Sequence, residues 1–236
     1  MKFWVGTSGF SYKPWVGSFY SDGLAAKDML RFYASRLPAV EINNTFYRMP
    51  NENVLQSWAE QVPVGFRFVL KAPQRITHVK RLKDTADDVG YFFRVAESLA
   101  GTAGPTLFQL PPNFKKDLEI LQRFISSLPS ERAIAFEFRH PSWFDEQTFA
   151  ALRQHNCALC RADTDESEVS DLLSTANWGY LRLRRAGYSA PELVRWKERM
   201  LAQDWSETYV FFKHEDEGIG PKLATEFLEH VAKRAE

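Results

Sequence analysis

Charged and amide side chains recur at the late positions of short apolar runs along the chain. Glu137, Asp163 and Lys71 could transfer protons, because a carboxylate can act as a general base and an ammonium as a general acid. A second group could bind polar or anionic parts of a ligand through arginine forks, amides and hydroxyls. Its members are Glu41, Asn43, Tyr47, Gln109, Arg139, Arg182, Arg184 and Lys213. The sequence therefore predicts acid/base chemistry on an anionic ligand, of the hydrolase, isomerase or lyase type.

Aromatic side chains gather after the first of these runs. Phe10, Tyr12 and Trp15 lie close together in a segment that also contains glycine and proline, and Trp143 follows a later run. Such rings could seal the top of a barrel, or they could form a wall on which a base or a sugar ring stacks. The sequence leaves both interpretations open.

Eight strand-like runs alternate with helical patterns. The expected strands are 3–8, 39–46, 65–72, 106–110, 132–138, 158–163, 179–184 and 208–213. Apolar residues at spacings of three and four predict helices over 26–36, 51–61, 86–99, 118–128, 145–155, 190–201 and 221–233. The stretch 167–174 is short enough for only one or two helical turns.

This alternation predicts an α/β fold, a closed (β/α)8 barrel of the TIM type with eight parallel strands. The 236 residues suit one barrel domain over 1–236. An open doubly wound sheet is the alternative, but it would normally carry a glycine-rich phosphate turn after an early strand. The segment Gly6–Gly9 does not have that pattern and is followed by aromatic residues.

Alternation within the strands assigns each polar side chain to a face, and active sites of TIM barrels lie at the carboxyl ends of the strands. The side chains predicted to point inward are Glu41, Asn43, Thr45, Lys71, Gln109, Glu137, Arg139, Arg161, Asp163, Arg182, Arg184, Lys213 and Glu215. Cations outnumber carboxylates in this set, which favours an anionic ligand with Arg139 and Arg182 as its main anchors. A salt-bridge network that only closes the barrel is the alternative. A pair of carboxylates for glycoside hydrolysis is also available, but their separation decides that chemistry.

The overall charge narrows the possible partners. Lys+Arg and Asp+Glu number 30 each and the pI is near 7.0, so a globally basic nucleic-acid binder is disfavoured. A protein that binds or processes nucleic acid, with arginines on phosphates and aromatic residues on bases, remains the alternative function, and a partner scaffold is a third. The N-terminus lacks the apolar stretch of a signal peptide, and no run is long enough to span a bilayer. We therefore expect a cytoplasmic protein without a membrane partner.

Metal or redox chemistry is a weaker hypothesis. His78, His140 and His214 fall near strand ends together with Asp163 and Glu215, yet no H-x-H or H-E-x-x-H spacing exists. Alternation also places His140 and His214 on the outward faces of their strands. Cys157 and Cys160 form a lone C-x-x-C at the start of a strand, and we interpret them as two small buried residues. No cofactor is expected.

Four blocks of sequence occur in a specific order. They are Gly-Thr-Ser-Gly-Phe-Ser-Tyr at 6–12, Val-Glu-Ile-Asn-Asn-Thr-Phe-Tyr-Arg at 40–48, Phe-Gln-Leu-Pro-Pro at 108–112 and Phe-Glu-Phe-Arg-His-Pro-Ser-Trp at 136–143. Together the blocks, which span most of the chain, resemble the YecE-like family, domain of unknown function seventy-two. The resemblance implies a TIM-barrel-like fold and no established reaction.

The chain departs from that family at two strand ends. The family usually has an Arg-Leu-His-Gly-like segment where this chain has Arg-Leu-Arg-Arg at 182–185. It often has a Phe-Asn-Asn-like segment where this chain has Phe-Lys-His-Glu at 212–215. We therefore expect a ligand shared by the wider family to be bound differently here.

Overall fold

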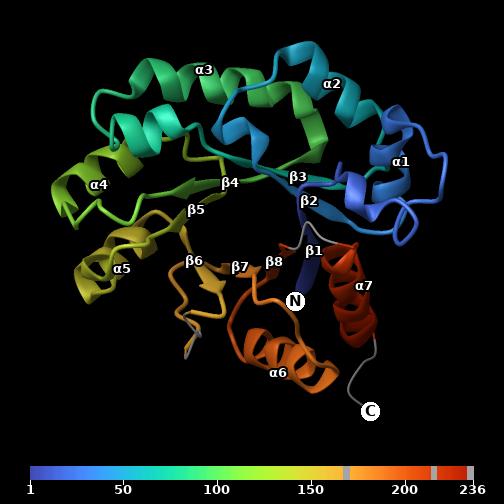
Figure 1. Ribbon diagram of the computed structural model, residues 1–236. Coiled ribbons are helices and arrows are strands. Elements are labelled where there is room, and N and C mark those ends of the chain that lie inside the picture. The colour runs from blue at the N-terminus through green and yellow to red at the C-terminus, as the bar shows by residue number, and fades with distance from the viewer. Residues whose placement is uncertain (167–170, 214–216, 233–236) are drawn as a thin grey trace.

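Eight parallel strands close into a barrel in the computed structural model (Figure 1). The structure describes residues 1–166, 171–213 and 217–232. The strands are β1 (Lys2–Ser8), β2 (Ala39–Ile42), β3 (Arg67–Lys71), β4 (Ala103–Gln109), β5 (Ile134–Glu137), β6 (Ala158–Asp163), β7 (Trp178–Leu183) and β8 (Glu207–Phe212). Each strand pairs in parallel with the next, and β1 pairs with β8 to close the ring. The predicted closed, eight-stranded parallel barrel is confirmed.

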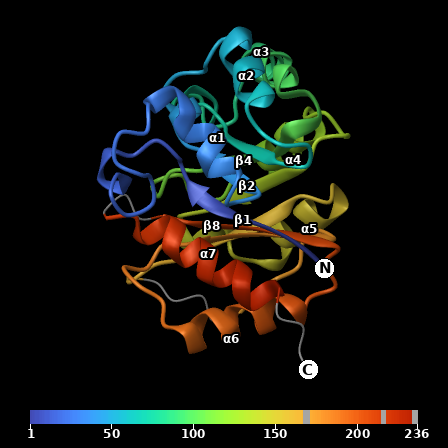
Figure 2. The same cartoon turned by 90° about the vertical axis from the view of Figure 1, so that its right-hand side faces the viewer.

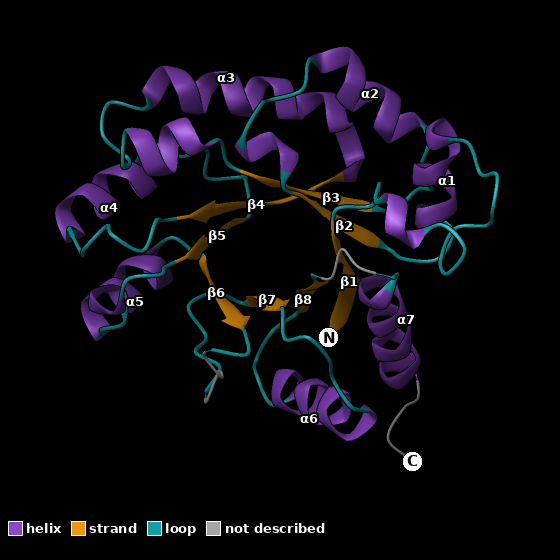
Figure 3. Ribbon diagram, in the orientation of Figure 1, coloured by secondary structure: helices purple, strands orange, loops and turns teal. Residues whose placement is uncertain are grey.

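Helices surround the ring of strands (Figure 3). They are α1 (Met29–Ala34), α2 (Glu52–Glu60), α3 (Ala86–Ala96), α4 (Leu118–Ser126), α5 (Glu146–Gln154), α6 (Ala190–Leu201) and α7 (Ile219–Ala232). Three begin at side chains that accept a backbone N–H three residues on, namely Asn51, Asp117 and Asp145. Such caps satisfy donors that the first helical turn leaves free. Figure 2 shows α7 lying across β1 and β8.

The strand predicted over 39–46 ends earlier than expected. After Ile42 the chain turns into a short 3-10 helix, Asn44–Phe46. Thr45 is buried there, and its hydroxyl contacts the backbone oxygens of Ile42 and Lys71 at 2.9 and 2.6 Å. Thr45 therefore links the end of β2 to the end of β3 through its hydroxyl, and it does not line a ligand site.

The connection from β6 to β7 differs from the others. The described residues between them, 164–166 and 171–177, form no helix. Of the one or two helical turns predicted over 167–174, residues 171–174 are irregular and 167–170 lie outside the described residues.

Two apolar layers lie on the two faces of the sheet. The inner layer includes the large rings of Trp4, Tyr180, Tyr209 and Phe211, packed with aliphatic and other small apolar residues of β2 to β6. The outer layer packs the opposite strand faces against the helices. Continuous burial on both faces is expected for a parallel sheet covered by helices.

A glycine lets β1 and β2 come close together. A Cβ atom at Gly6 would lie 1.9 Å from the carbonyl oxygen of Ala39. The Tyr33 hydroxyl binds across the same junction, donating to Ala39 O and accepting from Thr7 N, each at 2.9 Å. This close pairing brings Ser8, at the end of β1, beside Glu41 on β2.

Cys157 and Cys160 are both buried and unbridged, as predicted. Burial raises the pKa of the Cys157 thiol to about 12, which disfavours a reactive thiolate. Within the three described ranges, no helix is long and apolar enough to cross a membrane.

Candidate active site at the barrel mouth

A buried charge network, formed by Glu41, Glu137 and Arg182, lies inside the barrel near the carboxyl ends of the strands. The Arg182 guanidinium donates from Nη1 to Glu137 Oε2 at 2.7 Å and from Nη2 to Glu41 Oε1 at 2.8 Å. The three residues are at most 3% exposed. Arg182 thus links β7 to β2 and β5 across the interior, and its fork is occupied by carboxylates of the protein itself.

The network keeps its carboxylates ionised. Burial acts to raise the pKa of Glu137, but the charge of Arg182, followed by that of Arg139, outweighs burial and lowers it to about 2. The pKa of Glu41 is also lowered, because Arg182 and the hydrogen bond from Tyr180 outweigh burial. A carboxylate held this firmly as an anion is a weak base, which argues against Glu137 as the general base.

Neutral side chains complete the bonds of the two carboxylates. Ser8 Oγ and Tyr180 Oη donate to Glu41 at 2.7 and 2.6 Å. Gln109 Nε2 donates to Glu137 Oε1 at 2.5 Å. Gln109 is 3% exposed, so the predicted ligand-binding amide instead orients Glu137.

Three further cations, Lys71, Arg139 and Arg184, are called the mouth cations here. Arg139 and Arg184 follow Glu137 and Arg182 by two residues and so lie one layer nearer the open end of the barrel, whereas Lys71 is the last residue of β3. Arg139 keeps one contact with the network, from Nε to Glu137 Oε1 at 3.2 Å, while 41% of its side chain is exposed. Arg184 is half-buried, and within the described residues it forms no ion pair. Burial, then the charge of Arg182 and to a smaller extent that of Arg139, lowers the pKa of both Lys71 and Arg184, so the cations at this end of the barrel disfavour one another's charged forms.

Lys71 is the most enclosed of the mouth cations. It is 9% exposed, and its Nζ lies 4.1 Å from the centroid of the Phe46 ring. Burial, followed by the charge of Arg182, lowers the pKa of Lys71 to about 8. Its amine therefore exchanges a proton close to neutral pH, as a general acid or base requires.

His78 is a functional candidate that the sequence suggested only as a metal ligand. It lies on the π-helical turn Arg75–Val79 after β3, and its ring meets the Phe46 ring edge-on at 4.8 Å. Burial and the charge of Lys71 lower its pKa, so the neutral imidazole is favoured. Its Nδ1 lies 2.8 Å from Thr77 Oγ1.

Two predictions are wrong, one about a role and one about a placement. Arg182 was expected to anchor the ligand, but it is 2% exposed and both Nη atoms bind carboxylates. Arg161 and Asp163 were expected inside the barrel, whereas the inner face of β6 carries Ala158 and Cys160.

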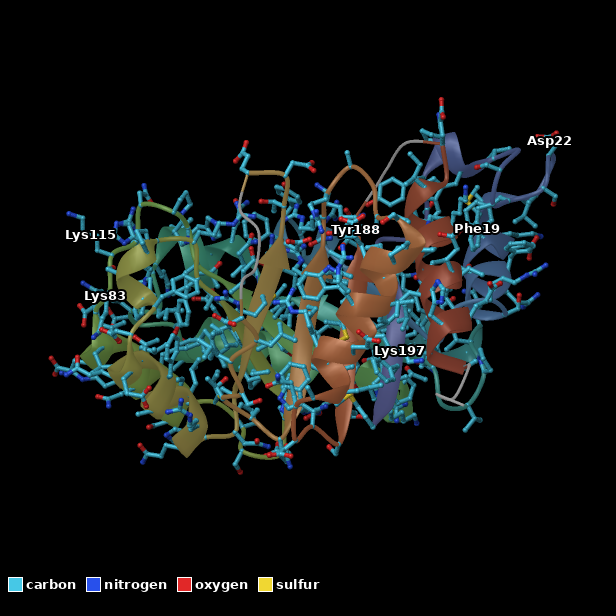
Figure 4. The ribbon with its side chains drawn as sticks, turned by 90° about the horizontal axis from the view of Figure 1, so that it is seen from below. Phe19, Asp22, Lys83, Lys115, Tyr188 and Lys197 are labelled. Carbon is cyan, nitrogen blue, oxygen red and sulfur yellow. The ribbon has the colours of Figure 1, made fainter. Side chains whose placement is uncertain are left out.

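Asp163 instead forms hydrogen bonds on the outer side of the barrel wall. It accepts from Tyr188 Oη at 2.8 Å and from Arg185 Nε at 2.7 Å. Tyr188 belongs to the outer apolar layer, and its ring meets Phe212 at 6.0 Å. Figure 4 shows Tyr188 at the same end of the molecule as Phe19, above Lys197 of α6. We therefore remove Asp163 from the candidate catalytic group.

The remaining predicted ligand residues lie at the rim. Asn43 is half-buried, with Nδ2 3.2 Å from Glu41 Oε1 and Oδ1 3.3 Å from Arg182 Nη2. Tyr47 is 74% exposed and packs on Phe46. Lys213 follows β8 and is half-buried. These positions fit contact with a bound ligand, although Asn43 also supports the network.

The predicted aromatic wall divides into two pairs. Trp15 and Trp143 are at most 1% exposed, and Trp143 donates from Nε1 to Phe114 O at 2.7 Å; both are structural. Phe10 and Tyr12 are only partly buried and line a cavity beside the mouth. Trp58 lines the same cavity. From the sequence, it was predicted only as part of the apolar face of a helix.

The candidate metal ligands do not assemble among the described residues, which contain no group of three or more His, Cys, Asp and Glu side chains. His140 caps the short helix Pro141–Trp143 by accepting from Ser142 N. His214 and Glu215 lie outside the described residues.

The fold and the site define a TIM-type barrel with a buried charge network under a cationic mouth. The chain belongs to the family described as "Protein of unknown function DUF72", which it matches over residues 4–236. It is similar to the crystal structure of a DUF72 family protein from Thermotoga maritima MSB8, at 29% identity and a TM-score of 0.87, over 99% of this chain and 100% of that one. The resemblance seen in the four sequence blocks is confirmed.

Curated relatives give the same result. The UPF0759 protein YecE of Escherichia coli (strain K12) is 34% identical over 150 residues, which are 61% of this chain and 53% of that protein. The match thus spans about half the length of that relative. The UPF0759 protein YunF of Bacillus subtilis (strain 168) is 24% identical over 253 residues, covering 90% of this chain and 89% of that one.

Proposed function

We propose that the protein is an enzyme that binds a phosphorylated or otherwise anionic small molecule at the barrel mouth and acts on it by acid/base chemistry. One observation carries the proposal: Lys71 and Arg184 approach other cations while, in the described part of the chain, neither forms an ion pair with a carboxylate. Like charges held together this close to a core cost free energy unless an anion compensates them.

The network beneath the mouth strengthens this argument. Arg182 neutralises one of the two negative charges of Glu41 and Glu137, and Arg139, which contacts Glu137, balances the other. Lys71 and Arg184 are therefore cations in excess of what the network needs. Arg139 and Arg184 present planar forks, which bind phosphate or carboxylate oxygens in pairs. We assign these two arginines to anion binding.

We assign proton transfer to Lys71. Its lowered pKa, about 8, lets the amine donate a proton to a substrate oxygen and take one back near neutral pH. The neutral ring of His78, which like Lys71 packs against Phe46, is our candidate for relaying that proton. Hydrolysis, isomerisation and elimination all fit such a pair.

A small anion is favoured over nucleic acid as the ligand. The chain has no net charge, whereas nucleic-acid binders usually spread basic residues over a broad face. Affinity for nucleic acid would fall steeply over a wide range of salt, because many counterions are released. A ligand held by two or three cations would show a shallower dependence.

Thermal melts in phosphate and in chloride at matched ionic strength test the proposal. A ligand that binds only the folded state stabilises it. At a phosphate concentration ten times the Kd, we expect the melting temperature to rise by roughly 3–6 °C. The Arg184→Ala variant should lose most of this rise.

Arg161→Ala is the matched control, because Arg161 lies at the same end of the barrel on the outer face of β6, with its guanidinium 5.3 Å from the Phe144 ring. This variant should keep the full phosphate-dependent shift. Coincident melts of the wild-type protein in phosphate and in chloride would contradict the proposal.

A further inference from the structure

A side cavity opens next to the barrel mouth. Its volume is about 390 Å³, and its walls come from the loop after β1, from α1, from the end of β2 and from α2. The apolar part includes Phe10, Tyr12, Leu30 and Trp58. This volume lies within the range of small-molecule sites, roughly 300–1,000 Å³.

The aromatic rings of the cavity are held in fixed orientations. Phe10 and Trp58 meet edge to face, with centroids 6.1 Å apart and planes at 89°. Trp58 is also stacked on Phe68 of β3 at 6.0 Å, and Tyr12 Oη donates to Ser8 O at 2.7 Å. A flat ring entering the cavity would meet rigid aromatic surfaces, which lose little conformational entropy on binding.

Polar groups form the other edge of the cavity. Asn44 exposes its side chain there, and Gln61 and Asn43 also line the space. Gln61 uses its Nε2 to donate to Ser57 O at 2.8 Å, which leaves its amide oxygen as an acceptor. Amides at the rim of an aromatic pocket can bind the donors and acceptors on the edge of a heterocycle.

Asn43 connects this cavity with the mouth. It follows Ile42, which pairs with Leu70, so Asn43 stands level with Lys71 on the neighbouring strand. Adjacent strands lie about 5 Å apart. A ligand in the cavity can therefore extend a substituent to Lys71 at the mouth without a long linker.

We propose that the side cavity binds a planar, hydrogen-bonding ring of the ligand whose anionic group occupies the mouth. The substrate class is then a phosphate ester that carries a heterocyclic ring, the size of a nucleoside monophosphate. This inference rests on the proposed function, because the mouth supplies the anion site. It adds a specificity site made of Phe10, Trp58 and the amides at its edge.

Calorimetric titration with three ligands tests the inference: inorganic phosphate, ribose 5-phosphate and adenosine 5′-monophosphate. Stacking a base on an aromatic side chain contributes about 1–3 kcal/mol, so the nucleotide should bind at least roughly fivefold more tightly than ribose 5-phosphate. The Trp58→Leu variant should lose this advantage and keep its affinity for inorganic phosphate. Tyr91→Leu, which changes an exposed aromatic residue on α3 away from the cavity, should behave like the wild type.

The possible outcomes separate the two proposals. Equal affinities for ribose 5-phosphate and the nucleotide, with phosphate still bound, would overturn the ring site and leave the anion site intact. Absence of binding by all three would overturn both. If Trp58→Leu does not fold, Phe10→Leu and quenching of the wild-type tryptophan fluorescence replace it. Trp58 is only partly buried, whereas the other six tryptophans are buried, so the nucleotide but not ribose 5-phosphate should quench.

Discussion

Arg182 and Arg184 are two residues apart in β7 and the segment that follows it, and they face the same side, yet they have different surroundings. Arg182 is 2% exposed and binds two carboxylates. Arg184 is half-buried, and its pKa is lowered by burial and then by the charges of Arg182 and Arg139, which outweigh the opposite effect of Glu137 and Glu41. The arginine of the buried network therefore has its counter-ions within the protein, whereas Arg184 at the mouth forms no ion pair with a described residue.

This difference explains how one set of charged strand ends can serve two purposes. Buried ions need partners in the fold, because an orphaned charge costs several kcal/mol. A binding site for an ion needs charges that have no counter-ion within the fold and that pair with the ligand instead. The salt-bridge network that the sequence offered as one alternative is present, and the ligand site that we propose would lie beside it at the barrel mouth.

Replacing Arg182 should cause the largest loss of stability. Arg182→Met leaves Glu41 and Glu137 buried without their main counter-ion, and we expect the free energy of unfolding to fall by about 3–5 kcal/mol. Urea denaturation measures the loss. A loss below about 1 kcal/mol would mean that the network is not the structural layer we describe.

The acid stability of the protein should depend on Glu137. Its pKa is lowered from 4.5 to about 2 in the folded protein, so it stabilises the fold above pH 4.5, and this contribution is lost as the pH falls towards 2. In urea titrations across that window, the stability difference between wild type and Glu137→Gln should shrink. Glu229→Gln, on the exposed face of α7, is the control and should track the wild type throughout.

Anion affinity should depend on the protonation of Lys71. The pKa of Lys71 is about 8 in the free protein, and a bound anion favours the ammonium form. Affinity for sulfate, which does not itself titrate in this range, should therefore fall by up to about tenfold per pH unit above pH 8. Lys71→Met should remove the inflection, whereas Lys222→Met, an exposed change on α7, should retain it. The same inflection in Lys71→Met would exclude Lys71 from the site.

The smallest expected effect has the opposite sign to that of Arg182. Arg184→Met removes a half-buried cation from the neighbourhood of Arg182 and Arg139, and we expect it to stabilise the protein in chloride by about 0.5–1 kcal/mol. In saturating phosphate the order should reverse, because only the wild type gains the bound anion. Destabilisation by Arg184→Met in chloride would mean that Arg184 stabilises the fold, as the buried charge network does.

The sequence pattern predicted the barrel and the inward orientation of the buried charge network. Alternation placed Glu41, Glu137 and Arg182 inside correctly, since each has apolar neighbours that pack outward. It could not predict the pairing, because Arg182 finds its carboxylates 45 and 141 positions away. Such contacts depend on barrel closure, which no local pattern encodes.

The predicted orientation of the β6 side chains was wrong for a physical reason. Both faces of a strand in a parallel barrel are buried, so polarity does not fix the phase of the alternation. The interior of β6 takes the small residues Ala158 and Cys160, which leaves room for the large side chains of the opposite strands. Leu159 and Asp163 therefore face the helices. Trp58 was missed for a similar reason, since the apolar face of a helix does not reveal a cavity at its edge.

A crystal structure in the presence of tungstate would test the two-layer account most directly, because tungstate is a tetrahedral dianion that can be located by anomalous scattering. We predict one tungstate at the barrel mouth, within hydrogen-bonding distance of Arg139 and Arg184, with the Arg182 bonds to Glu41 and Glu137 unchanged. Tungstate bound only on the outer surface, with the mouth empty of anion, would contradict the account.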